Sequence, residues 1–194
     1  MSYPFTNKVS TSKKSQWVNR CVGIVIHHTA WGTYMWNVNY LSKNPAQASV
    51  HFVIWPDWEV AKIWDPRDIL WHAGNGSWGW FENVNTGFLW IEVVGYWEYN
   101  VQQLIRLTDL VEYLMFVYQI DRDNIVRHSD VTQPRVITRE RKYWDGKQKV
   151  KKLDIGVQFF GNDARTGHDT FQKWRSQLIP RPISRYGDLD TMQW

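Results

Sequence analysis

Apolar residues recur along the chain in two patterns, short runs typical of strands and one long stretch at helical spacing. The short runs predict strands, because residues two apart along a strand share one face of a sheet. They lie at residues 22–26, 49–54, 59–63, 87–95 and 125–127. Pro56 and Asp57 form a turn signal between the second and third runs, which predicts a hairpin.

Helical spacing dominates residues 101–119, where apolar residues recur three and four positions apart. Asn100 lies directly before this stretch and suits an N-cap, so we expect a helix over 101–119. A shorter helix is expected over about 168–178 on the same spacing. Strands that alternate with helices, without a linker, predict an α/β fold: a single domain with a central mixed β-sheet flanked by helices.

The length of 194 residues corresponds to one ordinary domain of about 100–200 residues. No apolar run approaches the roughly 18–20 residues of a bilayer-spanning helix, and the first residues carry Lys and Ser where a signal peptide has an apolar core. We therefore expect neither membrane insertion nor classical secretion. The single cysteine, Cys21, excludes a disulfide framework and a multi-cysteine zinc finger, so a metal site would use His and carboxylate ligands.

The net charge of +4 is concentrated in one segment. Eight Lys and Arg residues between positions 135 and 152 stand against Glu140 and Asp145, a local charge of +6 that leaves −2 (4 − 6) for the rest. Such a segment can contact nucleic acid, an acidic polymer such as a bacterial wall, or only solvent. The 14 tryptophans have no repeat period and indicate no repeat architecture.

Histidines stand at the ends of two predicted strands. His27 follows the first strand and His128 the last. A catalytic zinc ion takes three protein ligands and leaves its fourth position for water. His27, His128 and the later Asp154 would supply such a set. In the strand at 87–95, alternation places Glu92 on the face opposite Leu89.

Six short segments follow one another in an order that matches a known family. They are IHHTA at 26–30, SVHFVI at 49–54, WHAGN at 71–75, IE at 91–92, RH at 127–128 and KLDIG at 152–156. With these segments and the long helix, the chain resembles the zinc-dependent N-acetylmuramoyl-L-alanine amidases of type 2. That family shares its fold with phage-type lysozymes and peptidoglycan recognition proteins.

The resemblance implies a hydrolase that cleaves the amide bond between N-acetylmuramic acid and L-alanine of the stem peptide in peptidoglycan. It implies that His27, His128 and Asp154 bind Zn²⁺. Glu92 resembles the family's general base, and Lys152 resembles the lysine that stabilises the oxyanion. Substrate-binding positions carried over from the family are His28, Thr29, His51, His72 and Asn75.

The chain departs from the family pattern around the third ligand. The interval from His128 to Asp154 is long, 26 residues (154 − 128), and contains the basic segment, which indicates an insertion. Asp130 and Asp145 are therefore rival ligands, although the Lys-x-Asp-x-Gly context favours Asp154. Ile155 stands where the family usually has proline.

A second departure concerns the general base. Val50 occupies a position where phage-type relatives often carry a catalytic tyrosine. The role of general base therefore falls on Glu92 alone.

On this resemblance the chain divides into an N-terminal extension (1–19), an amidase domain (20–178, with a basic insertion at about 131–151) and a C-terminal tail (179–194). We expect a monomer whose partner is bacterial peptidoglycan, with no nucleic acid and no membrane insertion. Without a signal peptide, cytoplasmic synthesis followed by release to the cell wall is expected. A phage endolysin and a bacterial wall-turnover enzyme both fit this description.

Two other functions are open on the sequence. The first is a peptidoglycan-recognition module that keeps the groove and has lost catalysis. The set of candidate metal ligands argues against it, because a pure binding module needs none of them. The second is nucleic-acid binding through the basic segment, which would require that segment to act alone.

Two tryptophans stand where the family has glycine. Trp58 lies in the predicted hairpin turn, where a bulky residue is costly, and Trp90 lies two residues before Glu92. One hypothesis is that some of these codons are read as glycine in the source organism, which would also explain the tryptophan excess. Peptide mass spectrometry of the native protein tests it: glycine is expected at one or both positions, and tryptophan at both would exclude the hypothesis.

Overall fold

The computed structural model describes residues 18–28, 41, 49–57, 59–74, 76–95, 100–131 and 164–182. Residues 1–17 of the predicted extension, 183–194 of the predicted tail and all but the first residue of the predicted basic insertion lie outside this part. Trp58 and Asp145 lie outside it as well.

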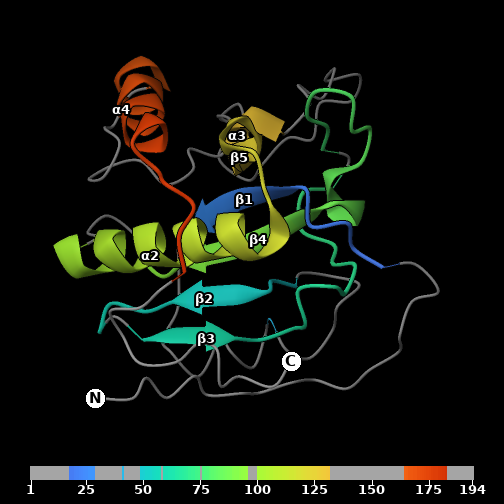
Figure 1. Cartoon of the computed structure of the whole chain (residues 1–194), viewed down its shortest axis with the longest axis horizontal. Coiled ribbons are helices and arrows are strands. Elements are labelled where there is room, and N and C mark those ends of the chain that lie inside the picture. Colours follow the sequence, from blue (N-terminus) through green and yellow to red (C-terminus); the bar gives the residue numbers. More distant parts are fainter. Residues whose placement is uncertain are drawn as a thin grey trace, which may run out of the picture.

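The described residues form one five-stranded sheet in the order β3-β2-β4-β1-β5 (Figure 1). Its strands are β1 (Gly23–His28), β2 (Phe52–Ile54), β3 (Val60–Lys62), β4 (Phe88–Val93) and β5 (Ile125–Arg127). Strands β2 and β3 pair antiparallel as the predicted hairpin, and the other three pairings are parallel. The predicted mixed sheet in a single α/β domain is confirmed.

Three α-helices accompany the sheet in the described part: α2 (Val101–Tyr118), α3 (His128–Val131) and α4 (Ala164–Ser176). Two 3₁₀ turns, η1 (Val84–Thr86) and η2 (Arg122–Asn124), stand in loops. The predicted long helix is confirmed, whereas α4 begins and ends earlier than the expected 168–178. The sequence analysis missed α3, because a helix of four residues is too short to show periodicity.

Apolar residues fill both faces of the sheet. On the first face, side chains of β1 and β4 such as Ile26 and Ile91 pack against α2 and against Phe171 of α4. On the second face, Val25 and Trp90 pack with the loop segments between β3 and β4. Because His27 and Glu92 follow Val25 and Trp90 by two residues, both lie on the second face. Figure 1 shows α4 at the β5 end of the sheet.

The start of α2 is closed by a reciprocal pair of hydrogen bonds. The Asn100 side chain accepts from the Gln103 backbone N–H at 2.9 Å, and the Gln103 side chain accepts from the Asn100 backbone N–H at 3.2 Å. Asn100 Nδ2 also donates to the Pro56 carbonyl at 2.7 Å, which ties the helix to the hairpin turn. The predicted N-cap is confirmed.

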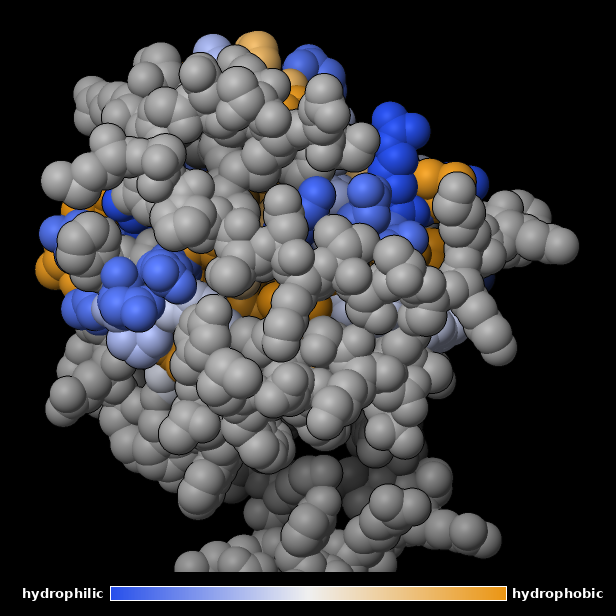
Figure 2. All heavy atoms as spheres, turned by 90° about the horizontal axis from the view of Figure 1, so that it is seen from below, coloured by the Kyte–Doolittle hydropathy of each residue, from blue (hydrophilic) through white to orange (hydrophobic). Residues whose placement is uncertain are grey.

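The described surface carries both hydrophilic and hydrophobic side chains, and both are visible from below in Figure 2. Its most exposed large apolar residues are Trp80, at 75% exposure, and Val101, at 70%. Within the described ranges, no helix is both long enough and apolar enough to cross a bilayer.

We predict that Asn100→Ala lowers the free energy of unfolding by about 1 kcal/mol, because it removes the cap and leaves backbone N–H groups of the first turn without this acceptor. Urea unfolding at neutral pH measures the change. Gln102→Ala is the matched control, since Gln102 is exposed in the same turn and should change stability by less than about 0.5 kcal/mol. Equal effects of the two variants would contradict the prediction.

Candidate active site

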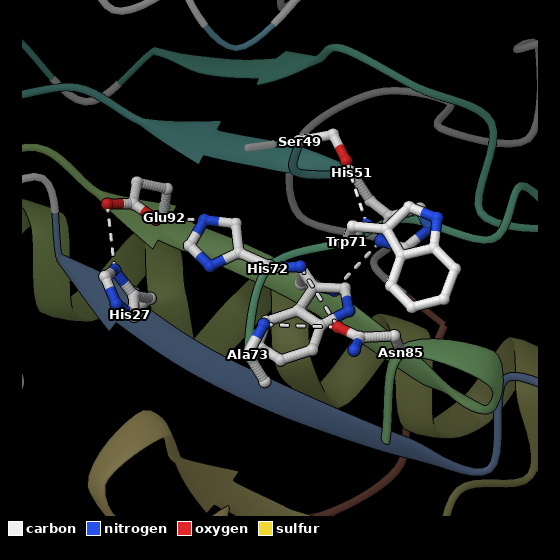
Figure 3. A network of polar contacts seen from close by, with 9 residues as sticks. His27, Ser49, His51, Trp71, His72, Ala73, Asn85 and Glu92 are labelled. Atoms are coloured by element: carbon white, nitrogen blue, oxygen red, sulfur yellow. Dashed lines mark hydrogen bonds and ion pairs between the residues drawn. The ribbon is translucent and has the colours of Figure 1, made fainter. Parts of the chain in front are cut away.

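The site begins with the register of two parallel strands. Strand β1 pairs with β4 so that His27 lies opposite Glu92. His27 Nδ1 is 3.0 Å from Glu92 Oε1, and both side chains are more than nine-tenths buried. Figure 3 shows the two side chains directed toward each other from neighbouring strands. The pair lies at the carboxyl ends of parallel strands, where α/β folds usually bind ligands.

His72 reaches the same carboxylate from the loop between β3 and η1. Its Nε2 is 3.2 Å from Glu92 Oε2, and its ring stacks on Trp90 with centroids 5.1 Å apart. Each carboxylate oxygen of Glu92 therefore faces one imidazole (Figure 3). The family resemblance implied a substrate contact for His72, and this contact with Glu92 was not predicted.

Asn85 holds the His72 loop in place. Its Oδ1 accepts from the backbone N–H groups of His72, at 3.0 Å, and Ala73, at 3.1 Å, and its Nδ2 donates to the Gly74 carbonyl at 2.8 Å. Asn85 is completely buried, and its side-chain amide bonds three backbone groups of the loop that carries His72. Asn85 was not predicted, because a lone asparagine before a strand carries no signal for such a role.

His128 completes the group from the other side of β1. Strand β5 pairs with β1 and ends at Arg127, so His128 is the first residue of α3. Its ring centroid is 4.3 Å from that of His27 and 6.3 Å from that of His72. Three imidazoles and one carboxylate thus meet at one end of the sheet.

Two opposing effects act on the Glu92 carboxyl. Burial alone would raise its pKa, but the charge and hydrogen bond of His27, together with the hydrogen bond and charge of His72, outweigh burial and hold the pKa below its ordinary value. Glu92 is therefore ionised at neutral pH and lies between the imidazoles of His27 and His72.

The donor set suits a metal ion. One ligand atom each from His27, His72 and Glu92 lies within 4.8 Å of the others, and the His128 ring adjoins His27. Imidazole nitrogen and carboxylate oxygen are ligands that Zn²⁺ takes in proteins. In addition, His72 Nδ1 is buried without a hydrogen-bond partner among the described atoms. Side chains of the types that bind zinc are thus gathered around His27, whose ring adjoins that of His128.

The remaining predicted residues divide into two groups. His28 is half-buried at the end of β1, with its ring centroid 5.9 Å from that of His27. Thr29, Asn75, Lys152 and Asp154 lie outside the described residues. Their roles stay predictions.

Asp130, one of the rival ligands, binds Arg127. Its Oδ1 and Oδ2 accept from Arg127 NH2 and Nε at 2.8 and 3.1 Å. With both oxygens held by one guanidinium, Asp130 does not face His27 as a ligand would.

His51 is part of the scaffold. Its Nδ1 accepts from the Trp90 backbone N–H at 2.9 Å, and its Nε2 donates to the Asp68 carbonyl at 3.1 Å. The residue has no exposed surface. While these bonds hold, neither ring nitrogen is available for the substrate contact that the resemblance implied.

Trp90 is fully buried in β4 under the His72 ring. Its indole N–H has no hydrogen-bond partner within the described part of the chain, which is an unfavourable arrangement for a buried donor. The hypothesis of glycine at this position stays a prediction.

The sequence pattern of the N-acetylmuramoyl-L-alanine amidase family matches residues 18–146, more than half of the chain. The chain belongs to this family. The match covers His27, His72, Glu92 and His128 and ends before Lys152. No curated protein matches this amidase-family chain in sequence.

Solved structures share the amidase fold with this chain. AmpDh3 from Pseudomonas aeruginosa, in complex with an anhydromuramic pentapeptide, is 23% identical with a TM-score of 0.54 over 65% of this chain and 57% of its own. AmiD from E. coli is 19% identical with a TM-score of 0.53 over 62% and 53%. LysC from Clostridium intestinale is 24% identical with a TM-score of 0.50 over 64% and 83%. The chain thus spans little more than half the length of AmpDh3 and AmiD.

We predict that His51 makes stability depend on pH. Burial, the largest influence, lowers its pKa from 6.5 to about 4, and the hydrogen bond to the Asp68 carbonyl offsets this only in part. Between these pH values His51 is protonated in the unfolded chain and neutral in the folded chain. The free energy of unfolding therefore falls as pH falls from about 6.5 to about 4, by about 3 kcal/mol in total.

The measurement is urea unfolding from pH 4 to pH 7.5 with a chelator present, so that metal release does not contribute. His51→Asn should be less stable than wild type at pH 7 and show a shallower loss toward pH 4. Parallel curves for the two proteins would mean that His51 does not carry this dependence.

Proposed function

We propose that this chain is a zinc-dependent hydrolase that cleaves the amide bond between N-acetylmuramic acid and L-alanine in peptidoglycan. The observation that carries the proposal is the buried carboxylate of Glu92 held beside His27, with the His128 ring 4.3 Å from that of His27. Family membership supports it. The structures of AmpDh3 and AmiD, which share the fold, were determined with muropeptides.

His27 and His128 would hold the metal together with Asp154. The first two side chains adjoin each other, and Asp154 is assigned through its Lys-x-Asp-x-Gly context. When bound, zinc polarises the scissile carbonyl and lowers the pKa of a coordinated water to about 7.

Glu92 is the general base. It takes a proton from the attacking water and delivers it to the nitrogen of L-alanine as the amide bond breaks. His72 donates its Nε2–H toward Glu92 Oε2 and so holds the carboxylate in one orientation. The fully buried Trp90 stacks on the His72 ring and so limits its movement beside Glu92.

Lys152 would place positive charge next to the oxyanion that forms on the scissile carbonyl. A donor in this role contributes on the order of 3–4 kcal/mol to the transition state in other enzymes. Lys152 comes two residues before Asp154 in the sequence, so a chain that places the aspartate on the metal also brings the lysine close to it.

The physiological setting that we propose is the bacterial cell wall. The basic segment at 135–152, with its local charge of +6, would attract an anionic wall. We propose cytoplasmic synthesis and release to the wall, as for an endolysin or a wall-turnover enzyme, and action as a monomer.

Elemental analysis and product release test the function together. The purified chain should contain one zinc per molecule and release new L-alanine amino termini from peptidoglycan, and a chelator should abolish the release. Peptidoglycan binding without zinc and without release would instead identify a recognition module. A salt-sensitive DNA gel shift by a protein that holds no zinc and releases no L-alanine termini would point to the basic segment as a nucleic-acid site.

We predict that Glu92→Gln retains one zinc per chain and lowers kcat about 10²–10⁴-fold, because the amide cannot accept the proton. His128→Ala should lose both zinc and turnover. Glu82→Gln is the matched control, since Glu82 is an exposed carboxylate in the loop before η1, and it should retain both.

The same experiment distinguishes two roles for Glu92, general base and orienting partner of His27. A carboxylate that only orients His27 would, when replaced, lower zinc affinity about 10–100-fold. Loss of zinc from Glu92→Gln would therefore contradict the general-base role, as would near-normal turnover.

A further inference from the structure

His128 is flanked by two residues that bind each other. Asp130 Oδ2 accepts from the backbone N–H of Arg127 at 2.9 Å and from its Nε at 3.1 Å, while Oδ1 accepts from NH2 at 2.8 Å. The carboxylate thus spans the junction where β5 ends and α3 begins. We call this pair, Arg127 and Asp130, the His128 clamp.

The clamp links the backbone before His128 to the side chain of a residue after it. Arg127 is the residue before α3 and Asp130 is the third residue of that helix, so the bond from the Arg127 N–H to Asp130 is one half of a capping box. A helix of four residues is unstable by itself. The clamp therefore restricts the backbone angles that direct the His128 side chain.

Helix α4 supports the clamp from the first face of the sheet. The Arg127 guanidinium lies over the ring of Phe171, 5.3 Å from its centroid, and Phe171 is completely buried. One turn later, Arg175 NH1 donates to the backbone carbonyls of Asp123 and Ile125, both at 3.2 Å. Both ends of β5 are thus fixed to α4.

We propose that Asp130 and Arg127 are positioning residues that aim His128 at His27 and thereby set the metal affinity of the site. This inference rests on the proposed function in one respect, the assignment of His128 as a ligand. The energetic reason is local. Arg127 is more than nine-tenths buried, and a buried guanidinium that loses its carboxylate is strongly destabilised, so the junction rearranges toward solvent.

The first test is the zinc affinity of Asp130→Ala, measured by competition with a chromophoric chelator. We expect affinity to fall about 10–100-fold, as for other outer-shell residues of metal sites. The matched control is Asp123→Ala: Asp123 pairs with Arg175 at 3.7 Å, but its carboxylate is 87% exposed, so wild-type affinity is expected. Wild-type affinity in a folded Asp130→Ala would overturn the proposal.

Two milder variants cover the case in which Asp130→Ala does not fold. Asp130→Asn keeps an acceptor for the Arg127 N–H but lacks the negative charge. Arg127→Lys keeps the positive charge but cannot form the bidentate contact with Asp130. Each should reduce zinc affinity by less than the alanine variant. If both bind zinc as wild type does, the clamp has no positioning role.

A measurement without metal distinguishes failure of the clamp from failure of the proposed function. In the metal-free protein, nuclear Overhauser contacts between the His27 and His128 rings are expected from their separation of 4.3 Å. They should weaken in Asp130→Ala and persist in Asp123→Ala. Wild type that binds no zinc would reject the zinc function, whereas unchanged ring contacts in Asp130→Ala would reject the clamp.

Discussion

The pairing register of β1 and β4 is the constraint on which the site depends. It places His27 beside Glu92 and sends both to the face that α2 does not cover. Since side chains alternate along a strand, a slip of one residue in β4 would turn Glu92 into the apolar layer against α2. The apolar alternation of β4, with Leu89, Ile91 and Val93 in that layer, makes such a slip costly. The hydrophobic core thus determines where the carboxylate goes.

The same geometry explains how a charge is tolerated inside the protein. A buried carboxylate is costly unless it is paired and hydrogen-bonded. Here two imidazoles from different segments meet its two oxygens. The supporting groups, His51 behind Trp90 and Asn85 behind His72, use their own hydrogen bonds to fix backbone around the site. Histidines therefore serve two purposes in this chain: His27 and His72 face the Glu92 carboxylate, whereas the two ring nitrogens of His51 bond backbone groups.

Local pattern predicted most of the fold, and long-range contact determined most of the site. The strands, the face of Glu92 and the cap at Asn100 follow from alternation, helical spacing and side-chain chemistry within a few residues. The contact of His72 with Glu92 joins a loop to a strand. The bonds of His51, just before β2, reach Trp90 of β4 and the Asp68 carbonyl, so no local pattern reports them. Arg127, next to His128, contacts Asp130 of α3 and Phe171 of α4, and the second of these contacts joins distant parts of the chain.

The site is assembled from residues far apart in sequence. His27 and Glu92 are separated by 65 positions, and His128 follows His27 by 101 (128 − 27). Parallel pairings between such distant strands form late and slowly in folding. A chain still emerging from the ribosome, or one cleaved before α3, contains His27 and Glu92 but lacks the third imidazole. The group of three imidazoles and one carboxylate is therefore complete only after β5 and His128 have been synthesised.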